Sequence, residues 1–253
     1  MLFPKLLKML PLAPLVLVVC TSTQAQEMPP GGIIVNTTCT MAEGHTLDEV
    51  LQAARAIEYS DDGANFVFYR RPIGGGSFEP GFVLRTVYWD SVAHWAEGGS
   101  NPPSQQSRAR RQLNELLDCD NSNRSFWTNR NVNQGNAYAG GANQDTLMAA
   151  RRCRMKPGST LEQFYTNLQE LDAPYAQQGD TTLMQLSQEF IGPSNGQDMG
   201  TLVTVRLVGE NAMGLARRLD MSTKYVGTPD DAAVESCGNW VLFSSHIAHW
   251  GGL

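Results

Sequence analysis

A ten-residue segment near the start of the chain recurs in its second half with five of its ten residues unchanged. Residues 39–48 read CTMAEGHTLD and residues 153–162 read CRMKPGSTLE, so Cys, Met, Gly, Thr and Leu return 114 positions later. A second cysteine follows each copy, Cys119 after 80 residues and Cys237 after 84. Self-similarity at a fixed offset is typical of repeat architectures. The sequence therefore predicts an internal duplication, with two copies of about 100 residues that each build a core.

The residues before the first copy resemble a secretory signal. Lys5 and Lys8 precede an apolar stretch, and Thr23-Gln24-Ala25 forms a small-x-small cleavage site. We predict cleavage after Ala25 and a periplasmic or extracellular location. Lipid attachment at Cys20 is an alternative, although Val19 stands where that modification favours a small residue. No later segment approaches the about 20 apolar residues of a membrane span, so we expect no transmembrane segment.

These features divide the chain into five predicted parts. They are a signal peptide (1–25), an N-terminal tail (26–32), a first repeat (33–132), a linker rich in Asn and Gly (133–145) and a second repeat (146–253).

The charge of the chain argues against a nucleic-acid partner. The formal net charge is −6, and removing Lys5 and Lys8 with the signal makes it −8, whereas nucleic-acid binding needs a basic surface. The basic pairs are scattered and are predicted to lie on solvated faces or at strand ends. They are Arg70-Arg71, Arg110-Arg111, Arg151-Arg152 and Arg217-Arg218.

Four cysteines remain once Cys20 leaves with the signal. An even number in an oxidising compartment favours disulfides, and a copied unit should carry its own bridge. We therefore predict Cys39 with Cys119 and Cys153 with Cys237. Zinc is the alternative, but the cysteines lack the close C-x-x-C spacing of structural zinc sites.

Each copy is predicted to follow the order β-α-β-β-α-β. A capping box opens the first helix of each copy, Thr46 with Glu49 and Thr160 with Gln163, and an apolar stripe at helical spacing follows. Expected strands are 33–41, 66–73, 81–89 and 125–132, then 182–191, 201–208 and 240–249, with further helices at 91–97, 105–117 and 211–220.

This order is that of the ferredoxin-like split βαβ unit. The predicted fold class is α+β, with two tandem ferredoxin-like repeats. We expect the first and third strands of each repeat to be parallel neighbours, and the fourth to lie antiparallel beside the first. That arrangement would bring the two cysteines of each copy within disulfide reach.

The pattern C-x-M-x-x-G-x-T-L-[DE], with a cysteine before the last strand of each copy, resembles secreted bacterial tandem proteins of the dimeric α/β-barrel superfamily. That superfamily includes NIPSNAP-type and antibiotic-biosynthesis-monooxygenase-type domains. The resemblance covers both copies, and its motif is structural: a cysteine, a turn glycine and a helix cap. It implies that the repeats pack sheet to sheet into one pseudo-twofold α/β barrel, monomeric, with the helices outside and a cavity between the sheets.

Strand alternation indicates where a ligand could bind. One face of residues 81–89 carries Phe82, Leu84, Thr86 and Tyr88, and the corresponding face of residues 201–208 carries Leu202, Thr204, Arg206 and Val208. Such a mixture of apolar bulk with a few polar groups suits a ligand cavity. Arg206 is the main candidate, with Arg152, Tyr88 and Thr86 as further candidates, and Arg152 and Arg154 add positive charge. These residues favour a small anionic or carbonyl-bearing ligand.

Other motifs carry no recognisable chemistry. The Gly74-Gly75-Gly76 run lies between two strands, without the Lys-Ser/Thr and following helix of a phosphate loop. His246 and His249 lie three apart on an expected strand, and therefore on opposite faces, so we expect no metal site. No catalytic constellation can be assembled from spacing, and we expect no cofactor.

Two classes of function follow. The first is a secreted or periplasmic protein that binds a small ligand or interacts with another molecule. The alternative is a cofactor-independent enzyme, an oxygenase or isomerase acting on a small aromatic or carbonyl-bearing molecule in the cavity, which the superfamily resemblance implies.

Overall fold

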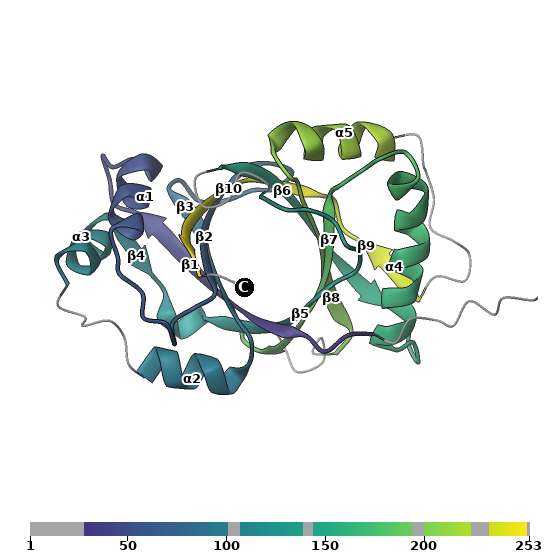
Figure 1. The fold of residues 1–253 in the computed structure, drawn as a ribbon, viewed down its shortest axis with the longest axis horizontal. Helices are drawn as coiled ribbons and strands as arrows, with labels where there is room; N and C mark the ends of the chain where they lie inside the picture. Colours follow the sequence, from purple (N-terminus) through teal and green to yellow (C-terminus); the bar gives the residue numbers. More distant parts are fainter. Residues whose placement is uncertain (1–27, 101–106, 139–143, 194–199, 224–232, 252–253) are drawn as a thin grey trace, which may run out of the picture.

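The computed structural model describes residues 28–100, 107–138, 144–193, 200–223 and 233–251. Its dominant element is one closed β-sheet, seen end-on as a ring in Figure 1. The predicted signal peptide, its cleavage site after Ala25 and Cys20 lie outside the described residues.

Eight of the ten strands form the ring. Their order is β10-β2-β3-β1-β5-β7-β8-β6, and β10 also pairs with β6, which closes the sheet. These strands are β1 (Gly32–Met41), β2 (Phe66–Gly74), β3 (Phe82–Trp89), β5 (Ser125–Asn131), β6 (Thr146–Met155), β7 (Leu183–Ile191), β8 (Leu202–Val208) and β10 (Val241–Trp250). Two short strands, β4 (Leu117–Cys119) and β9 (Val234–Cys237), pair with β1 and β6.

The predicted pair of ferredoxin-like repeats is wrong. The structure is a single closed antiparallel barrel, because β5 pairs with β7 and β10 pairs with β2. The last ring strand of each half thus hydrogen-bonds to a strand of the other half, so neither half has a sheet of its own. The barrel itself, with its helices outside, agrees with the architecture that the superfamily resemblance implied.

The predicted direction of the first and third strands is also wrong. β1 pairs with β3 antiparallel, and β2 pairs with β3 antiparallel, so the two parallel strands are β1 and β2 with β3 between them. Right-handed crossover rules apply to the strands that a helix connects. Here the helix connects β1 to β2, so the parallel relation belongs to that pair.

The helices cover the outside of the barrel (Figure 1). On one side lie α1 (Leu47–Arg55), α2 (Val92–Ser100), α3 (Arg108–Leu116) and the short 3-10 helix η1 (Asn121–Asn123), and on the other lie α4 (Leu161–Ala176) and α5 (Ala212–Ser222). Both predicted capping boxes are present. No helix in the described part of the chain has the length and apolar character needed to cross a membrane.

Alternation along the strands separates an outer core from the barrel interior. On β2, Val67 and Tyr69 belong to the core under the helices, whereas Phe68 packs inside the barrel with Met148 and Ile247. A second outer core lies under α4 and α5. Side chains of successive strand residues point to opposite faces, so a residue's parity on its strand decides whether it lines the lumen.

Two disulfides fasten the short strands to the barrel. Cys39 of β1 lies opposite Cys119 of β4 and is bonded to it, and Cys153 of β6 lies opposite Cys237 of β9 and is bonded to it. These are the predicted pairings. The strands β4 and β9 were not predicted, and they are what places each second cysteine directly beside its partner.

We expect non-reducing peptide mapping to recover the two linked peptides. Loss of either bridge should lower the free energy of unfolding, because a crosslink over about 80 residues restricts the unfolded chain, by at most about 4.5 kcal/mol. Urea denaturation of the double variant Cys39→Ser/Cys119→Ser tests this. A peptide joining Cys39 to Cys153 would contradict the pairing.

The two capping boxes differ in one ionisable group. The Thr46 backbone N–H donates to Glu49 Oε2 at 2.7 Å, and the Thr160 N–H donates to Gln163 Oε1 at 2.9 Å. Hydrogen bonds from Thr46 lower the pKa of Glu49 below its ordinary value. Because the folded chain favours the ionised form, Glu49 stabilises the fold above the pKa of an unfolded glutamate and loses this effect as the pH falls through its folded pKa.

Glu49→Gln should therefore lower the free energy of unfolding at neutral pH, and the difference from the parent should shrink in acid, as the pH falls through the folded pKa of Glu49. The reciprocal Gln163→Glu should stabilise at neutral pH and not in acid. Urea denaturation at both pH values measures this. A Glu49→Gln effect of equal size at both would contradict the role of the charge.

Candidate functional site

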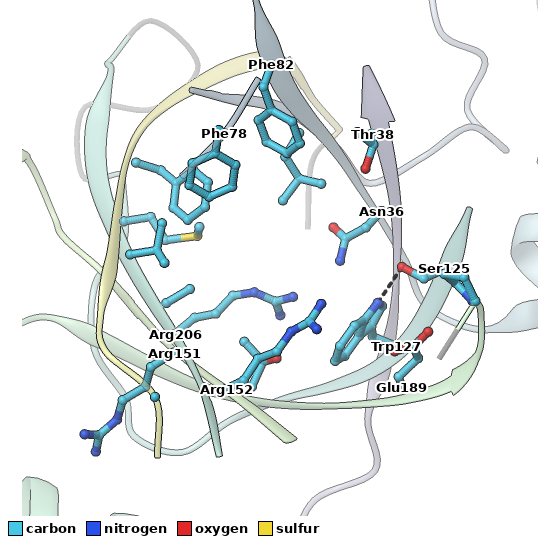
Figure 2. A pocket seen from close by; sticks show the side chains of 18 of the residues that line it. Asn36, Thr38, Phe78, Phe82, Ser125, Trp127, Arg151, Arg152, Glu189 and Arg206 are labelled. Carbon is cyan, nitrogen blue, oxygen red and sulfur yellow. Dashed lines mark hydrogen bonds between the residues drawn. The ribbon is translucent and has the colours of Figure 1, made fainter. Parts of the chain in front are cut away.

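A cavity of about 560 Å³ opens into one end of the barrel lumen. We call it the lumen cavity. Its walls come from both halves of the chain, with Asn36 from β1, Phe82 and Leu84 from β3, and Arg152 and Arg206 from β6 and β8. Figure 2 shows Arg206 and Arg152 pointing into this space, with Phe78 and Phe82 across from them.

Arg206 is the deepest charge of the lumen cavity, with 4% of its surface exposed. Its Nη1 donates to Ser187 Oγ and, at 3.5 Å, to Asn129 Oδ1. Both acceptors are neutral, and among the described residues no carboxylate forms an ion pair with it. Burial lowers the pKa of Arg206 to about 10, so the guanidinium is still charged at neutral pH.

Arg152 adds a second charge nearer the opening. It lies opposite Thr204 on the neighbouring strand, whereas Arg206 lies opposite Ala150, so the two arginines are two residues apart along the same wall. Arg152 is exposed. Its neighbour Arg151 points away from the cavity in Figure 2 and lies over the Trp240 ring, 4.5 Å from its centroid.

Aromatic rings form the wall that faces the arginines. Phe78 lies 4.8 Å from Phe82 and 6.0 Å from Phe243, measured between ring centroids. Trp127 lines the cavity as well and donates from Nε1 to Ser125 Oγ at 2.8 Å, the dashed line in Figure 2. Glu189, 7% exposed, is the one acidic side chain among the described residues of the lining.

A layer of hydrogen-bonded polar side chains crosses the barrel beneath the lumen cavity. Arg70 of β2 is fully buried at its centre and donates to Thr86 at 3.0 Å, Tyr88 at 3.2 Å and Ser245 at 3.2 Å. Thr86 in turn donates to Asn36 Oδ1 at 2.9 Å. Every described acceptor of Arg70 is neutral, so the layer holds a second buried charge without a carboxylate.

The other end of the barrel holds a second cavity, of about 820 Å³. Tyr88 faces this cavity and not the lumen cavity, and its hydroxyl donates to Gln185 Oε1 at 3.3 Å. Tyr138, from the predicted linker, closes part of the same end. It stacks on Phe68 with centroids 4.9 Å apart, and its hydroxyl lies 2.6 Å from Ser245 Oγ.

The four sequence-predicted candidates thus divide into three groups. Arg206 and Arg152 share the lumen cavity, Thr86 is buried in the polar layer, and Tyr88 lies beyond that layer. All the residues predicted to share a face on the third strands of the two copies follow the expected alternation. Their division along the barrel axis could not be seen from alternation, which assigns a face and not a depth.

Sequence reasoning missed Arg70, which the pair Arg70-Arg71 suggested would be solvated. Its position was readable in principle, since Phe66, Phe68 and Arg70 share one parity on β2 and the two phenylalanines mark the inner face. Arg218 of another basic pair is also buried, bound to Asp172 at 2.8 Å and Asp180 at 2.7 Å. Tyr138 had no such signal, because a lone tyrosine in an Asn- and Gly-rich segment has no periodicity.

His246 and His249 lie on the same face of β10, not on opposite faces as predicted. A register shift between Ile247 and His249 inserts an extra residue, so His246 lies opposite Tyr69 and His249 opposite Val67. His246 Nδ1 lies 2.9 Å from Asp145, and His249 stacks on Tyr59 at 4.0 Å. Across the described ranges, no three His, Cys, Asp or Glu side chains converge in a way that could hold a metal ion.

The two buried arginines should respond differently to replacement. Arg206→Met should change the free energy of unfolding by less than about 1 kcal/mol, because Ser187 still donates to Asn129 at 2.7 Å and a buried charge is removed. Arg70→Met should cost about 2–4 kcal/mol, since three hydrogen bonds from a charged group are lost. Urea denaturation of the two variants measures these changes. If both variants lost the same free energy of unfolding, Arg206 would be a structural residue like Arg70.

Comparisons with known proteins support the barrel and go no further. No family model matches the sequence, and no curated protein matches it. The fold is similar to a "putative monooxygenase" from Fusobacterium nucleatum (TM-score 0.51, 10% identity) and another from Lactobacillus acidophilus (TM-score 0.50, 9% identity), over 88% of this chain and 97% of each of theirs. An anthrone oxidase-like protein gives a TM-score of 0.47 at 9% identity, over 89% of this chain and 97% of its own. At such identities the likeness concerns the fold alone.

Proposed function

We propose that this chain is a small-ligand-binding protein of the periplasm or extracellular space, and that its lumen cavity takes a small aromatic molecule bearing a carboxylate or a polarised carbonyl. The observation that carries the proposal is Arg206: a charged guanidinium inside the barrel, facing an aromatic wall, with no carboxylate partner among the described residues.

The chemistry of the cavity supports an anionic ligand. A buried guanidinium costs several kcal/mol unless an anion or hydrogen-bond acceptors compensate it. Only Nη1 of Arg206 has partners within the described structure, which leaves Nε and Nη2 to donate to a ligand. Arg152 would contribute a second charge from the opening. Arg206 and Arg152 place two positive charges in the lumen cavity, and Glu189 is the single acid of its described lining, which favours a negatively charged ligand.

The shape and lining of the cavity support an aromatic ligand. A volume of about 560 Å³ falls within the range of small-molecule sites. Phe78, Phe82 and Trp127 offer ring faces and edges for stacking, an arrangement worth about 1 kcal/mol per ring pair beyond burial. A carboxylate held at Arg206 would direct the rest of the ligand toward these rings.

The proposed location rests on the cysteines. Two disulfides are compatible with an oxidising compartment and would be unusual in a reducing one. Residues 1–25, predicted to be the signal peptide, lie outside the described residues, so secretion itself remains a proposal.

Naphthoate and its neutral analogue naphthamide provide a direct test, with binding followed by calorimetry and by tryptophan fluorescence, to which the cavity residue Trp127 contributes. We expect naphthoate to bind more tightly than naphthamide. Arg206→Met should weaken naphthoate at least about tenfold, close to the value of one charge-assisted hydrogen bond. It should weaken naphthamide less, because the amide carbonyl accepts a hydrogen bond from Arg206 but carries no charge.

Arg71→Gln is the matched control, because Arg71 is an exposed arginine beside the buried Arg70 and its loss removes one charge from outside the lumen. Naphthoate binding that is equally weak in Arg71→Gln and Arg206→Met would contradict a specific lumen site. Native mass spectrometry of the protein purified from its own host would then show whether any small molecule is retained at all.

A second candidate is a cofactor-independent oxygenase or isomerase acting on such a ligand. The likeness in fold to two proteins described as "putative monooxygenase" favours it, as does the buried carboxyl group of Glu189 at the cavity wall, which could accept a proton. Incubating the protein with its retained small molecule under isotopically labelled oxygen tests this. Unlabelled, unchanged ligand would leave binding as the function.

A further inference from the structure

A separate pocket, of about 350 Å³, lies outside the barrel, between the sheet and the helices of the first half. Three arginines from three elements meet there: Arg85 of β3, Arg110 of α3, and Arg124, which follows η1. We call this the outer arginine pocket. Tyr59, Tyr69, Asn114 and Asn121 also line it with polar groups. A neighbouring cavity of about 180 Å³ shares Tyr59 and all three arginines.

The sheet and the helix caps place these side chains. Arg85 lies opposite Tyr69 on β2 and takes the outward parity on β3, next to the inward-facing Thr86. Arg110 lies in the first turn of α3, where its backbone N–H donates to the capping Ser107 at 3.3 Å. Arg124 is held by a hydrogen bond from Nη2 to Asn121 Oδ1.

The charge of the outer arginine pocket is not balanced by the protein. Its described lining contains no Asp or Glu, and no ion pair joins any of the three arginines to a carboxylate within the described ranges. Residues 101–106, which precede α3, contain no acidic residue either. All three arginines are half-buried, so solvent offsets their charges only in part.

The electrostatic surroundings point the same way. Burial lowers the pKa of Arg124, and the positive charge of Arg85 lowers it further. Burial raises the pKa of Tyr59 to about 12, so its hydroxyl is a neutral hydrogen-bond donor. The Tyr69 hydroxyl is fully buried and, within the part of the chain that the structure describes, makes no hydrogen bond of normal geometry.

We infer that the outer arginine pocket binds a phosphate or sulfate group, either as the free anion or as the end group of a small ligand. Guanidinium groups match the oxygens of such anions in pairs of parallel hydrogen bonds. Three arginines with two tyrosine hydroxyls supply more donors than a single carboxylate can accept, which favours a tetrahedral anion. The volume leaves room for a small group attached to it.

This site is independent of the proposed ligand in the barrel lumen. Arg85 and Thr86 are adjacent in sequence and point to opposite faces of the sheet, so the sheet itself separates the two cavities. An experiment can therefore contradict anion binding in the outer arginine pocket without contradicting ligand binding in the lumen cavity, and the reverse also holds.

Calorimetric titration of the full chain with inorganic phosphate, sulfate and phenyl phosphate tests the inference. We expect binding that weakens about tenfold or more in Arg110→Gln and in Arg124→Gln, because each loses one charged donor. Both residues are only half-buried, which favours folded variants, and the phosphate-dependent rise in Tm of the parent chain gives a second measurement. If phenyl phosphate binds more tightly than phosphate, the pocket recognises the end group of a larger ligand. If the two affinities are equal, the pocket recognises the free anion.

Arg108→Gln is the matched control, since Arg108 is an exposed arginine on the same helix outside the pocket. It should leave binding unchanged. Absence of phosphate and sulfate binding at millimolar concentrations overturns the inference, and so does binding that survives in Arg110→Gln and Arg124→Gln. Binding lost only in Arg152→Gln would place the anion in the lumen and overturn it equally.

Discussion

The strand β10 closes the barrel, and the positions of both candidate sites depend on that closure. Its Ser244 and Ser245 pair with β2 on one side and with β6 on the other. With β5 joined to β7, every ring strand has two neighbours and the ring has no free edge. Closure fixes the register of the strands, and the register decides which residues face inward. Of the adjacent residues Arg85 and Thr86, Thr86 faces the lumen and Arg85 faces outward.

The barrel interior is unusual in holding two buried arginines among neutral partners. Arg70 and Arg206 are surrounded by hydroxyls and amides, so their hydrogen-bonding capacity is met in part while their charge is not. In a medium of low polarisability such charges act over longer distances than in water. The positive charge of the two lumen arginines thus contrasts with the formal charge of −6 that the chain carries as a whole.

The sequence predicted local structure better than global pairing. The capping boxes of Thr46 and Thr160, the disulfide partners and the inward parity of Arg206 all follow from spacings of a few residues or from the repeat. Which strand edges meet is a long-range property, and alternation contains no information about it. A pattern that suits two separate sheets suits one closed sheet equally well, so the predicted ferredoxin-like repeats were wrong although most strands were placed correctly.

The sequence predicted the faces of the candidate site residues but not their positions along the barrel axis, which also depend on long-range structure. Alternation gave the face on which Arg206, Thr86 and Tyr88 lie, but their separation along the barrel axis depends on strand tilt and on side chains from the opposite wall. Arg70 followed the same rule as Arg206 and was overlooked because its neighbour Arg71 suggested a solvated pair. The bulge after Ile247 reversed the expected face of His249, and no spacing in the sequence signals an inserted residue of this kind.

The position of β10 in the chain also constrains the order in which the molecule can assemble. The strand that joins β2 to β6 follows every other strand in sequence, and its partner β2 begins 175 residues earlier, at Phe66 against Val241. As the chain emerges from the ribosome, the first half therefore exposes an unpaired β2 edge until the last strand is made. Such an edge is prone to pair with other chains. The late position of β10 in the chain therefore makes synthesis of the whole chain a condition for closing the barrel.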